Sequence, residues 1–290
     1  MSPPVAQPLV DGDWLADRLD DPNVRILDAS FYVPGSGRDA SGEFLARHIP
    51  NAAFFDVDAI RDEGNPLPHM LPPEEVFAAR VGALGIGNDT FVVVYDAPGS
   101  LAAPRAWWMF RAFGHDAVAV LDGGLSAWLD RGRATATGPA TPRATARFTA
   151  RFRPDLVCSA DDILADLAKG GGGGTVVDAR SPGRYAGVEA EPRPARKLGH
   201  IPGSVNMPAT SLVDPARAGA WRTADELAQA FASAGVDLGA PVVASCGSGV
   251  TACAVAFAAA LLGCDGVAVY DGSWAEWGNR DDTPVEGGSP

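Results

Sequence analysis

The chain has 290 residues, of which 47% are hydrophobic and 20% are charged, and its net charge is −13. This composition excludes a disordered chain, and the length allows about two domains of ordinary size. The acidic balance leaves no basic surface for a phosphate backbone, so nucleic acid is not expected as a partner. An anionic substrate would instead need arginines placed at its own site.

Cysteine usage and apolar patterning set further limits. Four cysteines without a CxxC pair, and only four histidines, are too few for a disulfide framework or a zinc site, so no metal or other cofactor is expected. The longest apolar run, 252–262, is far shorter than the roughly 20 residues that cross a bilayer. The first residues show no signal-peptide pattern. We therefore expect a soluble, cytoplasmic protein with reduced thiols and no membrane partner.

The chain contains an internal repeat. Four matches occur in the same order in both halves at offsets of 149–152 residues, which indicates two copies of one domain. We expect an N-terminal domain over 1–140, a linker over 141–156 and a C-terminal domain over 157–290. The matching segments are 26–29 with 176–179, 48–51 with 200–203, 92–96 with 241–246, and 118–123 with 267–272.

Short β-branched runs alternate with helical patterns along each copy. This alternation predicts an α/β fold in which a parallel sheet is covered by helices on both faces. The glycine run 170–174 is expected to be a flexible turn. The main predicted strands are 91–95, 175–178, 242–244 and 267–270, and the main predicted helices are 73–81, 105–113, 224–234 and 251–262.

The segment CGSGVTA begins at Cys246, after a predicted strand and before a predicted helix. Gly247 and Gly249 allow a tight bowl with inward amides, and the helix adds the positive end of its dipole. A cysteine in this place is expected to ionise readily and to act as a nucleophile, although a buried packing cysteine is the alternative. Cys253 and Cys264, in or just after an apolar helix, are expected to be packing residues.

Cysteine phosphatases cradle an oxyanion in a similar loop, which makes phosphatase activity an alternative. They require an arginine six residues after the cysteine to hold phosphate, and Ala252 stands at that position. Phosphatase activity is therefore a weak alternative. A bowl lined by amides and hydroxyls suits an uncharged or singly charged sulfur species instead.

The loop, the repeat, the two HIP segments and the stretch 270–277 (YDGSWAEW) together resemble the two-domain rhodanese family over nearly the whole chain. Members that use thiosulfate typically carry basic residues after the cysteine, whereas Gly247 and Ser248 resemble members that use 3-mercaptopyruvate. The resemblance implies sulfur transfer through a Cys246 persulfide to cyanide, a thiol or thioredoxin, with release of pyruvate. A thiosulfate:cyanide sulfurtransferase and a persulfide carrier without turnover are the alternatives.

The resemblance also implies a triad-like chain of Ser248, His69 and Asp58. The carboxylate would fix the imidazole tautomer, and the imidazole would polarise the serine hydroxyl. Asp56 competes with Asp58, because alternation along a strand would place both on one face. Asp96 stands in the first copy where Cys246 stands in the second, so the first copy is expected to be catalytically inactive.

The spacing of Arg184 and Arg193 matches the substrate-binding arginines of the family. Forked guanidinium groups fit the planar carboxylate of an α-keto acid, and Arg196 is a competitor for Arg193. The loop residues expected to line the substrate site are Gly247, Gly249, Val250 and Thr251.

Two sets of residues are expected to be structural. His48 and His200 occur at equivalent places in both copies, which favours a role in fixing the turn before the next strand. Four tryptophans are expected in a core or at a domain interface, and they are Trp107, Trp108, Trp274 and Trp277.

Overall fold

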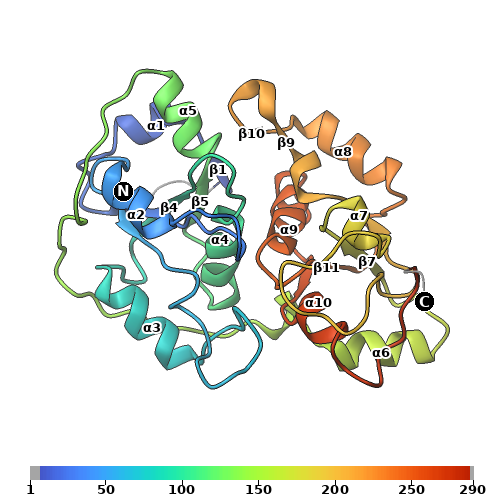
Figure 1. Cartoon of the computed structure of the whole chain (residues 1–290). Coiled ribbons are helices and arrows are strands. Elements are labelled where there is room, and N and C mark those ends of the chain that lie inside the picture. Colours follow the sequence, from blue (N-terminus) through green and yellow to red (C-terminus); the bar gives the residue numbers. More distant parts are fainter. Residues whose placement is uncertain (1–6, 288–290) are drawn as a thin grey trace. The chain divides into compact units, whose positions relative to one another are not determined.

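The computed structural model describes residues 7–287, and these residues form two compact units (Figure 1). Each unit contains its own five-stranded sheet. The units are not continuous in sequence: segment 64–70 groups with the second unit, and segment 214–221 with the first. Unit 1 comprises 7–63, 71–153 and 214–221, and unit 2 comprises 64–70, 154–213 and 222–287.

Unit 1 has a parallel sheet with strand order β1-β5-β4-β2-β3. Every residue of β2 and β4 is buried, as expected for parallel strands covered on both faces. Its elements are β1 (Leu9–Val10), α1 (Gly12–Ala16), β2 (Val24–Asp28), α2 (Ala40–Ala46), β3 (Ala53–Phe54), α3 (Glu74–Ala83), β4 (Phe91–Tyr95), α4 (Ala103–Ala112), β5 (Val118–Leu121) and α5 (Gly124–Asp130).

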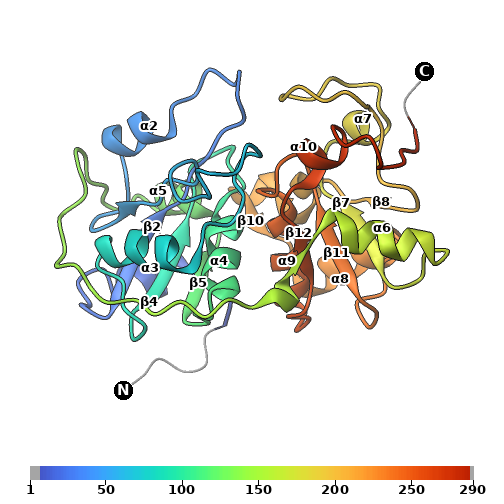
Figure 2. The same cartoon turned by 90° about the horizontal axis from the view of Figure 1, so that it is seen from below.

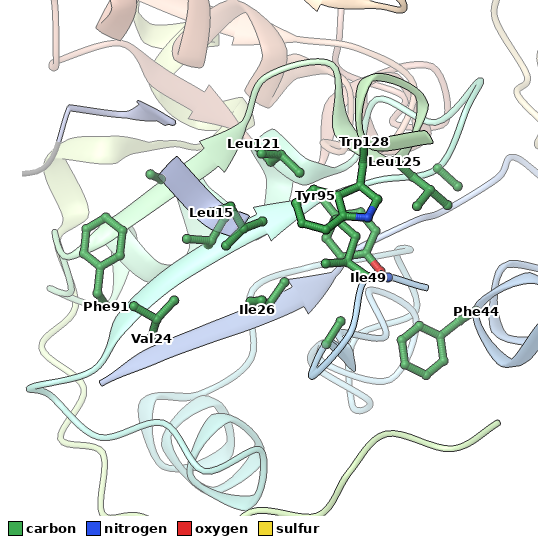
Figure 3. Close-up of a cluster of buried hydrophobic side chains, with 14 residues drawn as sticks. Leu15, Val24, Ile26, Phe44, Ile49, Phe91, Tyr95, Leu121, Leu125 and Trp128 are labelled. Atoms are coloured by element: carbon green, nitrogen blue, oxygen red, sulfur yellow. Dashed lines mark hydrogen bonds between the residues drawn. The ribbon is translucent and has the colours of Figure 1, made fainter. Parts of the chain in front are cut away.

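Alternate residues of the strands in unit 1 build one side of its core. Figure 3 shows Ile26 of β2 and Tyr95 of β4 pointing into one cluster with Trp128 of α5. A second cluster is aromatic, with the rings of Phe77 and Phe113 stacked at 4.3 Å. Burial on both faces of the sheet explains why these strands read as continuous apolar runs rather than alternating ones.

Unit 2 repeats this plan with strand order β6-β12-β11-β7-β8, again parallel throughout. A short ribbon pairs β9 (Val213–Asp214) with β10 (Ala220–Trp221), and apart from Val213 it belongs to the segment 214–221 that groups with unit 1. The remaining elements are β6 (Val157–Cys158), α6 (Ala160–Ala168), β7 (Thr175–Asp178), α7 (Pro182–Tyr185), β8 (Val205–Asn206), α8 (Ala224–Ser233), β11 (Val242–Ser245), α9 (Ala252–Leu261), β12 (Ala268–Tyr270) and α10 (Ser273–Trp277).

Helices cover the sheet of unit 2 on both faces (Figure 2), which confirms the predicted fold class. Helix α9 packs on β11 and β12, and it is buried on all sides, which fits its uniformly apolar sequence. On the other face, α6 packs against α10, and Tyr270 of β12 and Trp277 of α10 belong to the apolar cluster there. The four tryptophans expected in a core or at a domain interface are all buried, and they are Trp107, Trp108, Trp274 and Trp277.

Each predicted element lies within two residues of an observed one. Helix α4 begins at Ala103 rather than at the predicted Arg105, because Pro104 is tolerated in a first turn where its missing N–H costs nothing. The predicted linker has no strand, but it is not fully exposed. Phe148 is buried against the rings of Phe77 and Phe110, because removing its aromatic surface from water is favourable.

Candidate active site

Cys246 follows β11 directly, at the carboxyl end of the sheet, where open parallel sheets bind their ligands. Its side chain is buried, and those of Ser248 and Val250 are buried as well. Gly249 has a φ of +77°, a backbone conformation that a residue with a side chain adopts only with strain. The loop then enters α9 with Thr251 at the N-cap. The strand–loop–helix context predicted for the cysteine is therefore present.

Ser273 supports this loop from the start of α10, and the sequence reasoning missed it. The N–H groups of Cys246 and Gly249 each donate to Ser273 Oγ at 3.1 Å. The same hydroxyl donates to the Tyr270 carbonyl at 2.7 Å and lies 4.0 Å from Cys246 Sγ. Ser273 is fully buried with a φ of +49°, which costs roughly 1–3 kcal/mol for a residue other than glycine. A signal was available, because the first copy has Gly124 at the equivalent position.

Arg184 lies against the backbone of the cysteine loop. An ideal Cβ placed on Gly247 would lie 2.5 Å from Arg184 Nη2, which is closer than carbon and nitrogen atoms pack. A side chain on Gly247 would therefore have to displace the guanidinium, whereas the positive φ is what favours glycine at Gly249. The other side of the guanidinium contacts Glu191, whose Oε2 accepts from Arg184 Nη2 at 2.5 Å and from Nε at 3.1 Å.

His69 belongs to unit 2, although its sequence position lies in the first copy. Its Nε2 lies 3.3 Å from Arg193 Nη2, so the structure brings together two of the residues expected at the site. Because a guanidinium can only donate, Nε2 accepts, and the proton of the neutral ring is on Nδ1. His69 is 1% exposed and has a φ of +60°, a strained conformation of the kind found at functional sites.

Asp58 lies in unit 1, so its place in a triad with His69 and Ser248 stays a prediction from the resemblance. The strand argument for Asp56 was wrong, because β3 ends at Phe54 and the next residues form a turn. In that turn the Asp56 carboxylate accepts the N–H of Asp58 at 2.9 Å, an ordinary structural role. Ser248 shares unit 2 with His69, and within residues 7–287 no hydrogen bond joins the two.

The competing arginine and the other cysteines have structural surroundings. Arg196 pairs with Asp281 at 2.6 Å, and its side chain is 57% exposed, which supports Arg193 as the substrate residue. Cys253 is fully buried, and its Sγ donates to the Gly249 carbonyl at 3.3 Å. Burial and nearby Asp162 raise the pKa of Cys158 to about 12, so its thiolate is disfavoured. Cys264 is half-buried, and its Sγ donates to the Leu238 carbonyl at 3.5 Å. These contacts leave Cys246 as the nucleophile candidate.

The two HIP histidines have matching surroundings in their own units. The His48 ring stacks on Phe44 at 4.1 Å between ring centroids, and its Nδ1 bonds the Phe44 carbonyl at 2.8 Å. The His200 ring stacks on Tyr185 at 3.8 Å, with Nδ1 on the Tyr185 carbonyl at 2.9 Å. Each histidine also forms a backbone bridge to a later segment of the chain. These contacts fix the chain before β3 and before β8, as a structural role requires.

The loop of the first copy is built differently. Asp96 follows β4, and its carboxylate accepts the N–H groups of Ala102 and Ala103 at 2.8 and 2.9 Å. Burial raises the pKa of Asp96 to about 7, an effect that these two hydrogen bonds oppose. A side-chain carboxylate therefore takes the amides at the start of α4.

Comparison with known proteins identifies the family. The rhodanese-like domain model matches residues 11–131 and 159–280. The 3-mercaptopyruvate sulfurtransferase of Homo sapiens is 46% identical over 282 residues, covering 95% of this chain and 93% of that protein. The thiosulfate sulfurtransferase of Bos taurus is 44% identical over 279 residues, covering 94% and 92%. The crystal structure of SseA from Escherichia coli superposes with a TM-score of 0.83 at 39% identity, covering 93% of this chain and 100% of SseA. The chain belongs to the rhodanese family, with two rhodanese-like domains.

Two further findings concern the described part of the chain. Every helix within residues 7–287 is too short or too polar to cross a bilayer. In the same range, no cluster of three or more His, Cys, Asp or Glu side chains is arranged to hold a metal ion.

Proposed function

We propose that this chain is a sulfurtransferase that takes sulfur from 3-mercaptopyruvate and carries it as a persulfide on Cys246. The observation that carries this proposal is the Arg184 guanidinium, which lies against Gly247 beside the nucleophile. The loop side chains themselves are uncharged, so the cations come from outside the loop. This arrangement suits a donor with one carboxylate set apart from its reacting sulfur. The 46% identity to the human 3-mercaptopyruvate sulfurtransferase supports the same donor.

The first half-reaction transfers the sulfur atom to the enzyme. The Cys246 thiolate attacks the thiol sulfur of 3-mercaptopyruvate, an S–S bond forms, and the C–S bond breaks. The electron pair of that bond leaves with pyruvate as its enolate, which takes up one proton. We assign stabilisation of the sulfur charge to backbone N–H groups of the loop other than those of Cys246 and Gly249, which donate to Ser273 Oγ.

The proton for the enolate is assigned to Ser248, with His69 and Asp58 behind it. With its proton on Nδ1, the His69 ring can only accept at Nε2, and Arg193 already donates to that atom, so His69 and Asp58 are assigned to orienting Ser248 rather than to supplying the proton. Ser248 would pass the thiol proton of the bound donor to the enolate, which leaves the Cys246 persulfide as an anion. On this assignment Ser248→Ala lowers turnover with 3-mercaptopyruvate more than with thiosulfate, because only the first donor releases an enolate. Equal losses with both donors would exclude the relay.

The second half-reaction returns the thiolate. A thiophilic acceptor attacks the outer sulfur of the persulfide, the S–S bond breaks, and Cys246 leaves with the electron pair. Cyanide would give thiocyanate, and a dithiol would give a disulfide and hydrogen sulfide. Thioredoxin as the acceptor and the cytoplasm as the location stay predictions, which a coupled thioredoxin assay and cell fractionation would test.

The deciding experiment compares kcat/KM for 3-mercaptopyruvate and for thiosulfate on one preparation, with cyanide as acceptor. A strong preference for 3-mercaptopyruvate is the expected result. Preference for thiosulfate would leave Cys246 as nucleophile but would favour the activity of the Bos taurus relative, which is 44% identical. A burst of one pyruvate per chain without turnover would instead indicate a persulfide carrier.

A further inference from the structure

A chain of four charged side chains, of which Asp178, Arg180 and Glu191 are buried and Arg184 is half-buried, leads from the end of β7 to the cysteine loop. Arg180 is fully buried, and its Nη2 contacts the Asp178 carboxylate at 2.6 Å. The same nitrogen donates to the Gly199 carbonyl at 2.7 Å, and the guanidinium lies over the Trp274 ring at 4.2 Å. Arg180 is therefore fixed on several sides and cannot follow a ligand. Its remaining nitrogen, Nη1, donates to Glu191 Oε1 at 2.7 Å.

Glu191 divides its two oxygens between two guanidinium groups. Oε1 bonds the fixed Arg180, while Oε2 bonds Arg184 through Nη2 and Nε. The Glu191 side chain is only 6% exposed, so these charge-assisted bonds are shielded from water. A carboxylate anchored in this way holds Arg184 in a single orientation. The sequence reasoning did not select Glu191, because nothing in the sequence distinguishes it from the neighbouring Glu189.

This orientation has a direct consequence at the nucleophile. Arg184 Nη2 lies between the Glu191 carboxylate and the Gly247 backbone, and Nε is also bonded to Glu191. Within residues 7–287, Arg184 Nη1 is the nitrogen of this guanidinium that makes no hydrogen bond. Each terminal nitrogen of a guanidinium carries two N–H groups, so Nη1 and the second N–H of Nη2 are not used by the Glu191 bonds and can serve a substrate carboxylate. Arg193 is the second arginine that the family spacing assigns to that carboxylate.

We propose that Glu191 is a positioning residue that holds the Arg184 guanidinium beside Cys246 with Nη1 left for the donor carboxylate. The inference rests on the proposed function, in which Arg184 binds that carboxylate. Fixing a long side chain before the substrate arrives removes an entropy cost from binding. The role differs from that of a simple counter-charge, because a counter-charge would only weaken the attraction of Arg184 for an anion.

The two roles predict opposite signs in an experiment that needs no turnover. The alkylation ratio is the rate at which iodoacetate alkylates Cys246 divided by the rate for iodoacetamide. Iodoacetate is an anion and iodoacetamide is neutral, so a cation beside the sulfur raises this ratio. Glu191→Gln removes a negative charge, so a counter-charge role would raise the ratio. A positioning role lowers it, about tenfold, to the value of Arg184→Gln. Glu191→Asp keeps the charge but cannot reach both arginines, and it should lower the ratio too. Glu189→Gln, an equal charge loss two residues away, should leave the ratio unchanged.

A second variant tests the geometry with Glu191 intact. The methyl group of Gly247→Ala would lie 2.5 Å from Arg184 Nη2 and push the guanidinium away, so this variant should also lower the alkylation ratio and raise KM for 3-mercaptopyruvate more than it lowers kcat. An unchanged ratio in Gly247→Ala, or an increased or unchanged ratio in Glu191→Gln, would overturn the positioning role. Failure of the wild type to turn over 3-mercaptopyruvate would overturn the proposed function instead, while the alkylation ratio would still report the position of Arg184.

Discussion

The two units share one strand order, and they differ in the loop that follows the central strand of each sheet, β4 in unit 1 and β11 in unit 2. In unit 2 the loop after β11 holds Cys246, with its amides supported by Ser273. In unit 1 the loop after β4 holds Asp96, whose own carboxylate bonds the amides at the start of α4. The same fold position thus presents a nucleophile in one unit and a carboxyl group that bonds the loop's own amides in the other.

This difference shows what the fold supplies and what the loop residues add. Both loops place backbone N–H groups at the carboxyl end of a parallel sheet, where an anion is stabilised. Unit 2 leaves this environment to a sulfur atom, whereas unit 1 fills it with a side chain. The replacement also changes the supporting position, because Ser273 of unit 2 corresponds to Gly124 of unit 1. An added Cβ at Gly124 would lie 2.5 Å from the Asp96 carbonyl oxygen.

Removing the nucleophile should leave unit 2 as inactive in sulfur transfer as unit 1 is expected to be. Cys246→Ser should eliminate sulfur transfer completely, because the other thiols have structural contacts or a raised pKa and cannot replace it. Transfer is measured as thiocyanate formed, and the persulfide as a mass increase of one sulfur on the intact chain. An unchanged melting temperature would serve as the folding control. Residual transfer above background would contradict the assignment.

Loss of a binding arginine should weaken the donor without removing the nucleophile. Arg184→Gln or Arg193→Gln should raise KM for 3-mercaptopyruvate by about tenfold or more, since each charged hydrogen bond contributes roughly 1.5–3 kcal/mol. Steady-state kinetics with cyanide as acceptor would measure the change. Arg196→Gln is the matched control, because that side chain is exposed and pairs with Asp281. An unchanged KM in both variants would exclude the carboxylate clamp.

Giving unit 2 the residue of unit 1 tests the loop support. Ser273→Gly copies Gly124, removes the acceptor of two loop amides and relieves a strained φ. We expect kcat to fall by about tenfold, because two N–H groups of the reacting loop lose their acceptor, while the melting temperature stays equal or rises because the strain is relieved. Ser273→Ala removes the same hydroxyl but keeps the strain, so it should lose both activity and stability. Full activity in the glycine variant would show that the hydroxyl only fills space.

Much of this organisation was predictable because it depends on local pattern. Buried parallel strands, the loop before α9 and the two copies are visible as apolar runs, glycines and repeated motifs. The ion chain through Arg180 and Glu191 was not, because it joins residues whose partners are set by tertiary contacts. The grouping of His69 with unit 2 was missed for the same reason: sequence distance assigned it to the first copy. Ser273 required a residue-by-residue comparison of the two copies.

The smallest expected effect lies in the inactive loop. Asp96 has a folded-state pKa of about 7, above the value near 3.9 of an unfolded aspartate. Below about pH 4 both states hold the proton. Between about pH 4 and 7 the unfolded state loses it first, so the free energy of unfolding falls as the pH rises, and above pH 7 the loss is complete. Asp96→Asn mimics the protonated form and should abolish this contribution.

Urea unfolding at pH 5 and pH 8 measures this effect. We expect Asp96→Asn to gain on the order of 1–3 kcal/mol over the wild type at pH 8, and much less at pH 5. Burial also raises the pKa of nearby Asp28, but that group is present in both proteins, so its contribution largely cancels in the comparison. Sulfur transfer should be unchanged, because Asp96 takes no part in the chemistry of Cys246. Equal differences between wild type and variant at the two pH values would mean that Asp96 is ionised throughout, as a permanent anion in the loop of unit 1.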